Sequence, residues 1–337
     1  MANPVLIEVT RGDRVESIHR GAVSIVDADG KAVWQTGNTQ SPVFPRSAVK
    51  AIQALPLVES GAADAFGFTD EMLALACSSH SGEPGHVETA LAMLKEAGLD
   101  EAALECGGHW STHEAVLIEQ ARSFNEPPGA VCNNCSGKHA GFVCTAAHNG
   151  IDPMGYISPD HPTMEAVRIA MEDVTGAAHT VSEDCGTDGC SIPTHAIPLD
   201  AMALGFARMA TGSGLSEHRA KAAARLMQAC MTNPWFVAGT GRFCTTYMET
   251  GAGRLFAKTG AEGVFCGAIP ELGLGIALKC DDGGTRAAET MMAAVTAKLL
   301  GGADPLYDGL HNLARPTLRN RNKMVTGEIR PASEAFV

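Results

Sequence analysis

The stretch PRSAVKAIQ (residues 45–53) marks the point where the predicted structure changes from strands to helices. Before it, VLIEVT (5–10) alternates in polarity, and GAVSIVDADGKAVWQTG (21–37) predicts two strands joined at an Asp-Gly turn. Within it, SAVKAIQAL (47–55) has helical spacing, and Pro56 is expected to kink or end that helix. We therefore expect a hairpin at the N-terminus and helices after residue 45.

Helical spacing continues through the middle of the chain, and strands return near its end. The expected helices between about 85 and 250 are HVETALAMLKEAG, SGKHAGFVCTAAHNG, HPTMEAVRIAMEDVTG, LDAMALGFARMATG and SEHRAKAAARLMQACM. The expected later elements are strands at 254–260, 263–269 and 274–281 and a helix at 284–302. Short connections imply antiparallel pairing.

This order predicts an α+β protein in a single catalytic unit spanning 1–337. Its sheet part would comprise residues about 1–45 and 250–337, and its mostly helical part residues about 46–249. The functional cleft is expected between the two parts.

Composition narrows the possible partners. The net charge is −13, from 38 acidic and 25 basic residues, which argues against nucleic acid and anionic membranes. No apolar run approaches the roughly 18 residues of a membrane span. Acidic residues near the N-terminus do not suit a signal peptide. Because 11 cysteines cannot all pair within one chain, we expect reduced thiols and a cytoplasmic protein.

The first chemical motif is S-x-x-K, formed by Ser47 and Lys50. Residues three apart lie on one helix face, so the hydroxyl and the amine can meet. A lysine can activate a serine if desolvation lowers the lysine pKa. The alternative is a helix-capping serine beside a solvated lysine.

The second motif is Lys258-Thr259-Gly260, on a predicted strand. A helical S-x-x-K followed by a K-T-G strand resembles serine β-lactamases, penicillin-binding proteins and serine-dependent glutaminases. The chain lacks the S-D-N motif and an obvious deacylating glutamate, which disfavours β-lactam chemistry.

Four further segments extend the resemblance: CSSHSGEPGH (77–86), NNCSGKHAG (133–141), DCGTDGCSIP (184–193) and AKTGAEGVFCGA (257–268). With PRSAVKAIQ they resemble the L-asparaginase II family of the rhizobial type, in order along nearly the whole chain. The resemblance implies a β-lactamase-like fold, a homodimer, and hydrolysis of L-asparagine to L-aspartate and ammonia. It also implies two catalytic pairs, which are Ser47 with Lys50 and Ser79 with Lys258.

The resemblance further implies that Arg46 and Asp188 hold the amino acid. A guanidinium can bind the α-carboxylate bidentately, and a carboxylate suits the α-ammonium. Glu262 is a second candidate for the ammonium, although Asp188 lies inside the family motif. Ser79 would relay a proton or hold Lys50. His80 is a candidate substrate contact or, equally, a buried structural histidine.

Cysteine spacing also permits a metal site. Cys132-x-x-Cys135 and Cys185-x4-Cys190 would make a four-cysteine zinc site on spacing alone. The resemblance instead implies one zinc ion held by Cys135, Lys138 and Cys190, which would fix the loop that carries Asp188. Free buried cysteines are the alternative. SGKH (136–139) lacks the full phosphate-loop pattern, so we expect no nucleotide site.

The favoured function is therefore an L-asparaginase that works through a Ser-Lys activated acyl-enzyme. A glutaminase or another small-amide hydrolase is the alternative within the same class. A zinc-stabilised binding protein with structural serines is the alternative outside it.

Overall fold

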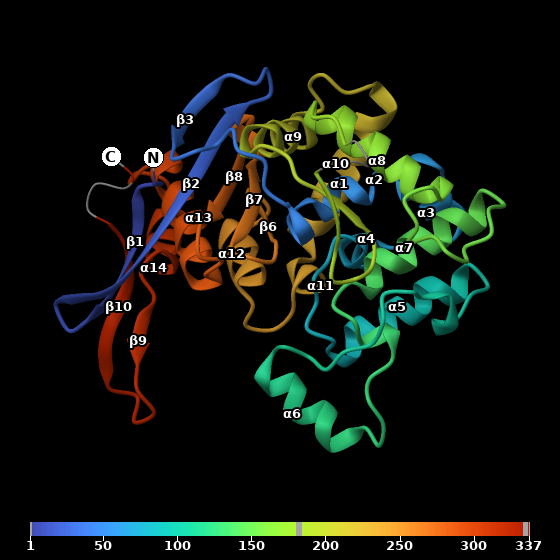
Figure 1. Cartoon of the computed structure of the whole chain (residues 1–337), viewed down its shortest axis with the longest axis horizontal. Coiled ribbons are helices and arrows are strands. Elements are labelled where there is room, and N and C mark those ends of the chain that lie inside the picture. Colours follow the sequence, from blue (N-terminus) through green and yellow to red (C-terminus); the bar gives the residue numbers. More distant parts are fainter. Residues whose placement is uncertain (1, 180–183, 333–335, 337) are drawn as a thin grey trace.

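One antiparallel sheet is assembled from both ends of the chain in the computed structural model, which describes residues 2–179, 184–332 and 336. Its eight strands run in the order β6-β7-β8-β2-β1-β10-β9, and β3 pairs with the far part of β2. Their bounds are β1 Val5–Arg11, β2 Arg14–Asp27, β3 Ala32–Thr36, β6 Phe256–Thr259, β7 Val264–Ile269, β8 Leu274–Cys280, β9 Thr317–Arg319 and β10 Val325–Pro331. In Figure 1 the blue and orange-red strands form this sheet, beside the helices of the middle segment. The predicted α+β class is confirmed.

Helices cover both faces of the sheet at β7 and β8. Ala268 on β7 pairs with Gly275 on β8, and a side chain at Gly275 would collide with the backbone of α9 (Leu199–Thr211). Successive strand residues point to opposite faces. Accordingly, the neighbouring Gly267 lies against Met292 of α13 (Thr285–Leu300). All six residues of β7 are buried between the two helices.

The middle segment is mostly helical. It contains η1 Arg46–Val49, α1 Lys50–Gln53, α2 Leu55–Glu59, α3 Ala62–Ala65, α4 Asp70–Ala76, α5 Pro84–Glu96, η2 Glu101–Ala103, α6 Glu114–Ser123, η3 Ala130–Cys132, α7 Ser136–His148, α8 Pro162–Thr175, α9, α10 Glu217–Thr232, α11 Pro234–Val237 and α12 Phe243–Gly251. The helix expected to kink or end at Pro56 breaks at Ala54, where α1 ends. Pro56 lies in the first turn of the next helix, α2, where its missing N–H group is not needed.

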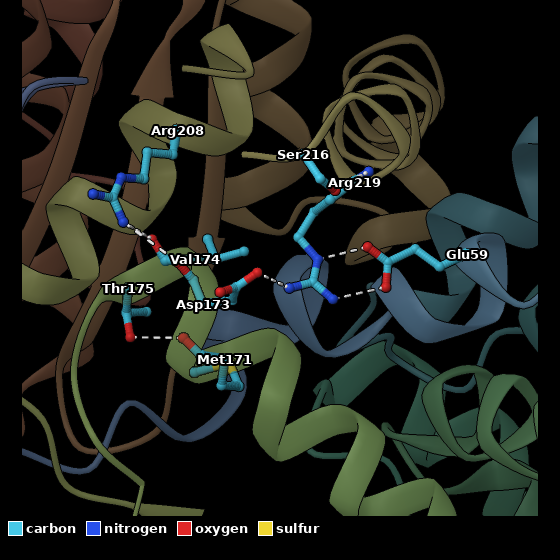
Figure 2. Close-up of polar contacts among 8 residues, drawn as sticks. All are labelled: Glu59, Met171, Asp173, Val174, Thr175, Arg208, Ser216 and Arg219. Atoms are coloured by element: carbon cyan, nitrogen blue, oxygen red, sulfur yellow. Dashed lines mark hydrogen bonds and ion pairs between the residues drawn. The ribbon is translucent and has the colours of Figure 1, made fainter. Parts of the chain in front are cut away.

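An ion-pair junction holds helices of the middle segment together (Figure 2). Arg219 on α10 donates two hydrogen bonds to the Glu59 carboxylate at the end of α2, at 2.6 and 3.0 Å, and also pairs with Asp173 on α8. Arg208 on α9 donates to the Val174 carbonyl oxygen at 3.2 Å. The fork of Arg219 therefore ties three helices to one another with charge-assisted bonds.

The structure contains some elements that were not predicted from the sequence. The helix predicted at 284–302 corresponds to α13. After it come three elements that were not predicted, which are α14 Tyr307–Leu313 and the strands β9 and β10. Strand β10 pairs with β1, so the C-terminal segment completes the sheet. A two-stranded hairpin, β4 Cys185–Thr187 with β5 Pro193–His195, presents the loop between them. Within the described ranges, no helix is long and apolar enough to cross a membrane.

Candidate active site

The two sequence motifs meet where η1 packs against the end of β6. A methyl group at Gly260 would lie 2.6 Å from the Pro45 carbonyl oxygen and 3.2 Å from the side chain of Ala48. Glycine is therefore required at the third position of K-T-G, because any side chain would push the turn that carries Ser47 away from the strand. This close approach brings the S-x-x-K turn and the strand lysine to one place.

The Ser79 hydroxyl lies between two lysine amines. Ser79 follows α4 in a loop whose backbone is fixed by its N–H bond to the Val237 carbonyl oxygen at 3.0 Å. Its Oγ lies 3.0 Å from Lys50 Nζ and 2.8 Å from Lys258 Nζ. Only 4% of Ser79 is exposed, and both lysines are fully buried. A hydroxyl held in this way can pass a proton from one amine to the other.

Lys258 is the amine whose protonation is most affected by the site. Burial, followed by the positive charge of Lys50, lowers the pKa of Lys258 to about 7. Its Nζ also lies 2.9 Å from the Thr259 carbonyl oxygen. A neutral amine can donate to that carbonyl and accept the proton of Ser79, so Lys258 can act as a base near neutral pH.

Lys50 does not contact Ser47, although a contact was expected from their spacing. Its amine instead donates to the Ser78 carbonyl oxygen, to Ser79 Oγ and to Cys135 Sγ at 3.1 Å. These acceptors use all three donors of a lysine ammonium. Ser47 is half-buried, and none of the residues that the structure describes hydrogen-bonds its hydroxyl. Of the two expected pairs, the structure therefore forms Ser79–Lys258 directly and links Lys50 to the same serine.

Two cysteines and a lysine form a buried cluster beside Lys50. Lys138 Nζ lies 3.0 Å from Cys190 Sγ, and Cys190 hydrogen-bonds to Cys135. That hydrogen bond, together with the charges of Lys50 and Lys138, outweighs burial and holds the pKa of the Cys135 thiol well below its usual value. Burial alone would lower the pKa of Lys138, but Cys190, Cys135 and Asp188 raise it.

The donor atoms of this cluster are of the kinds that can bind zinc. Two sulfurs and one amine converge with little solvent exposure, and one sulfur already favours the thiolate form that a metal requires. The positions of Cys135, Lys138 and Cys190 therefore fit such an ion, which would have to displace the proton of the Lys138 amine on binding. Cys132 and Cys185 do not join them. Among the described residues, the His, Cys, Asp or Glu side chains that bring three ligand atoms within 4.8 Å of one another are His19, Cys280 and Asp282, and this group contains none of the four cysteines.

Asp188 and Arg46 form an ion pair at the edge of this cluster. Arg46 Nε donates to Asp188 Oδ1, and the Gly189 N–H group donates to the same oxygen at 2.9 Å. Cys190 Sγ lies 3.5 Å from Asp188 Oδ2. Burial raises the pKa of Asp188, but Lys138 and Arg46 lower it by more, so the carboxylate stays ionised. Arg46 has φ +51, a strained conformation that commonly occurs at functional sites.

His80 and Glu262 occupy less central positions. Gly82 N–H donates to His80 Nδ1 at 3.0 Å, so His80 Nε2 carries the proton and donates to Ser136 Oγ at 2.9 Å. Burial lowers the pKa of His80 well below its usual value and keeps the ring neutral. With both nitrogens bonded, His80 orients the loop beside Ser79. Glu262 is exposed on the β6–β7 turn, where its carboxylate lies over Gly283.

The site is one continuous polar network rather than separate motifs. Sequence reasoning did not identify the Lys50–Cys135 contact, which joins the two buried lysines to the sulfur cluster through Ser79. It also missed Ser136, whose position at the start of α7 was the available signal. The members of the network, in order of contact, are Lys258, Ser79, Lys50, Cys135, Cys190, Asp188 and Arg46.

Comparisons with known proteins agree with the motifs. The family model of L-asparaginase II matches residues 7–331. A search of curated proteins finds no match.

Similar solved structures include the protein named Mglu, with 14% identity over 85% of this chain and 68% of that chain and a TM-score of 0.47. A β-lactamase from Mycobacterium bovis has 15% identity over 82% of this chain and 94% of that chain, with a TM-score of 0.41. A class C β-lactamase from Rhodobacter sphaeroides has 13% identity over 81% of this chain and 92% of that chain, with a TM-score of 0.40.

Proposed function

Because the chain belongs to the L-asparaginase II family, we propose that it hydrolyses the side-chain amide of L-asparagine to L-aspartate and ammonia. Family membership places it among amidohydrolases. The observation that carries the finer proposal is the position of Ser79 Oγ between the amines of Lys50 and Lys258. This arrangement supports proton transfer between the two lysine amines through the Ser79 hydroxyl.

Ser47 is the proposed nucleophile, because its half-buried hydroxyl is free of other partners and lies on the same turn as Lys50. Lys50 gives a proton to Ser79, and Ser79 gives its own proton to neutral Lys258. The neutral Lys50 amine then accepts the proton of Ser47 as the serine oxygen attacks the amide carbon. This step requires the Ser47 side chain to adopt a staggered rotamer that directs its oxygen toward the Lys50 amine. Such general base catalysis contributes typically about 10²–10⁴-fold to a rate.

The same relay then runs in the opposite direction. The carbon–nitrogen bond breaks as a proton returns from Lys258 through Ser79 to the leaving nitrogen, which departs as ammonia. The product of this step is an ester between Ser47 and the aspartyl group. A water molecule then attacks the ester and gives its proton through Ser79 to neutral Lys258, while Lys50 returns its proton to the Ser47 oxygen as the ester bond breaks. Transfer of one proton from Lys258 through Ser79 to Lys50 restores the starting state.

Arg46 and Asp188 support recognition of a free amino acid. They place a positive and a negative side chain next to each other, as the α-carboxylate and α-ammonium of a zwitterion require. The ammonium loses hydration when it enters the cleft, and a carboxylate offsets that cost. The network joins this pair to the proton relay through Cys190 and Cys135.

Cys135, Lys138 and Cys190 are the proposed zinc ligands. When bound, the ion would supply a fixed positive charge that keeps both thiols deprotonated and immobilises the loop between β4 and β5. This loop carries Asp188, so the position of Asp188 would be coupled to the metal.

The family resemblance is also the basis for proposing a homodimer, which light scattering in solution tests.

Release of ammonia from L-asparagine, compared with L-glutamine, tests the proposed activity. Ser78→Ala is a matched control for Ser79→Ala, because the buried Ser78 hydroxyl has no hydrogen-bond partner among the described residues. We expect Ser79→Ala to lower kcat/KM by at least about 10³-fold and Ser78→Ala to retain activity. Faster turnover of glutamine would favour a glutaminase. No turnover of either amide would contradict the proposal and favour a zinc-stabilised binding protein.

A further inference from the structure

A cavity of about 390 Å³ lies on the side of the sheet that α13 covers. It is formed by the start of α12, the first half of α13, the end of α14 with the segment that follows it, and one residue of β10. Its volume falls within the range of small-molecule sites. The polar side chains that line it are Arg242, Thr246, Arg286, Glu289, Thr290 and Asn312.

Two arginines line this cavity, Arg242 near the charge of Glu289 and Arg286 near that of Glu16. Arg242 donates to Ser81 Oγ at 3.3 Å, and Arg286 donates to His19 Nε2 at 3.2 Å. Neither forms a salt bridge with an aspartate or glutamate in the described part of the chain. The chain carries 38 acidic residues, so possible partners for an arginine are abundant. Because a guanidinium matches a carboxylate in shape and charge, the two side chains are suited to an anionic ligand.

Glu289 adds the opposite charge to the same cavity. Its carboxyl group is half-buried, and no described residue forms a hydrogen bond or salt bridge with it. Burial raises the pKa of Glu289 to about 7, although Arg242 acts in the opposite direction. An incoming ammonium group would stabilise the ionised carboxylate, as a nearby opposite charge does.

We propose that this cavity binds an acidic amino acid, whose two carboxylates contact Arg242 and Arg286 and whose ammonium contacts Glu289. The three charged side chains match the three charged groups of such a ligand in number and in sign. A monocarboxylic amino acid would leave one arginine unpaired, and a plain dicarboxylate would leave Glu289 unpaired. The cavity thus selects a dicarboxylate that also carries an amino group.

The site is separate from the proposed catalytic relay but adjoins it through Arg242. The hydrogen-bond partner of Arg242 is Ser81, two residues after Ser79 in the same loop. A ligand carboxylate would compete with Ser81 for this guanidinium. The proposal goes beyond the proposed function, since binding at this cavity requires no turnover, and it includes the product class of that function among its ligands.

Isothermal titration calorimetry of the full-length wild-type protein with L-aspartate tests the proposal. Arg286→Gln and Glu289→Gln are expected to weaken binding at this cavity at least tenfold, because each removes one charge pair. Arg321→Gln is the matched control, since Arg321 is exposed and lies outside the cavity. Binding at the proposed substrate site, which depends on Asp188, should persist in all three variants. Failure of the proposed enzyme activity would leave this cavity's binding unchanged, so the two proposals can fail separately.

Succinate provides a second readout because it has both carboxylates but no amino group. Succinate should bind this cavity at least tenfold more weakly than L-aspartate in the wild-type protein, and Glu289→Gln should abolish that difference. Circular dichroism confirms the fold of each variant, and Arg286→Met, which also removes the charge, replaces Arg286→Gln if the latter does not fold. Binding of L-aspartate that is unaffected by the substitutions at positions 286 and 289, or equal affinity for succinate, would overturn the proposal.

Discussion

The amine nitrogen of Lys50 lies 3.0 Å from the hydroxyl oxygen of Ser79, 29 positions further along the chain. Lys258 reaches the same oxygen from β6. The serine that lies three residues before Lys50 is not its partner in this structure. Lys50, Ser79 and Lys258 therefore form one hydrogen-bonded unit centred on Ser79, and the Ser47 hydroxyl is not part of it.

The first prediction concerns the nucleophile. We expect Ser47→Ala to abolish the ester intermediate, because its hydroxyl is the attacking group. Ser79→Ala should slow the formation of the ester without changing the position at which it forms. Mass spectrometry of protein quenched during turnover of L-asparagine locates the adduct. An aspartyl group attached to Ser79, or near-normal turnover by Ser47→Ala, would identify Ser79 as the nucleophile instead.

The second prediction concerns pH. The pKa of Lys258 is lowered to about 7, so its neutral, proton-accepting form predominates above that pH. The rate should therefore rise with pH through about 7 and fall as the lysine becomes protonated below it. The measurement is kcat/KM from about pH 5 to about pH 9. Lys258→Arg, which retains a permanent charge, should lose this ascending limb together with most activity. An ascending limb that persists in Lys258→Arg would assign it to another group.

The third prediction concerns Asp188 and substrate charge. Asp188→Asn leaves the substrate ammonium without a carboxylate. We therefore expect kcat/KM for L-asparagine to fall, mainly through a higher KM, by an amount that corresponds to about 2–5 kcal/mol of activation free energy. L-asparagine with an acetylated α-amino group should be a poor substrate of the wild-type enzyme. The substitution should affect this neutral analogue far less. Equal losses with both amides would show that Asp188 serves the fold or the chemistry.

The fourth prediction concerns zinc. Cys135→Ser and Cys190→Ser should each lose the metal, because each removes one of the three converging donors. Cys132→Ser and Cys185→Ser serve as matched controls and should retain about one zinc ion per chain. Metal analysis of the purified variants measures this. Equal loss from all four variants would support the four-cysteine site instead.

Periodicity and turn chemistry predicted much of the fold. The N-terminal hairpin was recognised from strand-like runs around an Asp-Gly turn, and the three strands after residue 250 from short apolar runs separated by turns. Strands β9 and β10 were not recognised, because β9 has only three residues and β10 mixes polar residues with a few buried ones. Pairing with β1, a contact between the chain ends, determines their structure.

The site was predictable as a set of residues but not as a set of contacts. The motifs identified Ser47, Lys50, Ser79 and Lys258, and helical spacing suggested that the first two would meet. That spacing carries no information about the loop after α4, whose buried Ser78 carbonyl and Ser79 hydroxyl draw Lys50 inward. The contact between Lys50 and Cys135 joins residues 85 positions apart and depends on the packing of α7. Tertiary packing therefore decides which serine each lysine reaches.

The most direct test of the account is a double-mutant cycle between Ser79 and Lys258. If both belong to one proton relay, Ser79→Ala and Lys258→Met should each lower kcat/KM by about 10³-fold or more, and the double variant should be hardly worse than either single variant. The assay is steady-state ammonia release from L-asparagine at one pH, with Ser78→Ala as the control. Losses that multiply in the double variant would show that Ser79 and Lys258 act independently, and would contradict the relay.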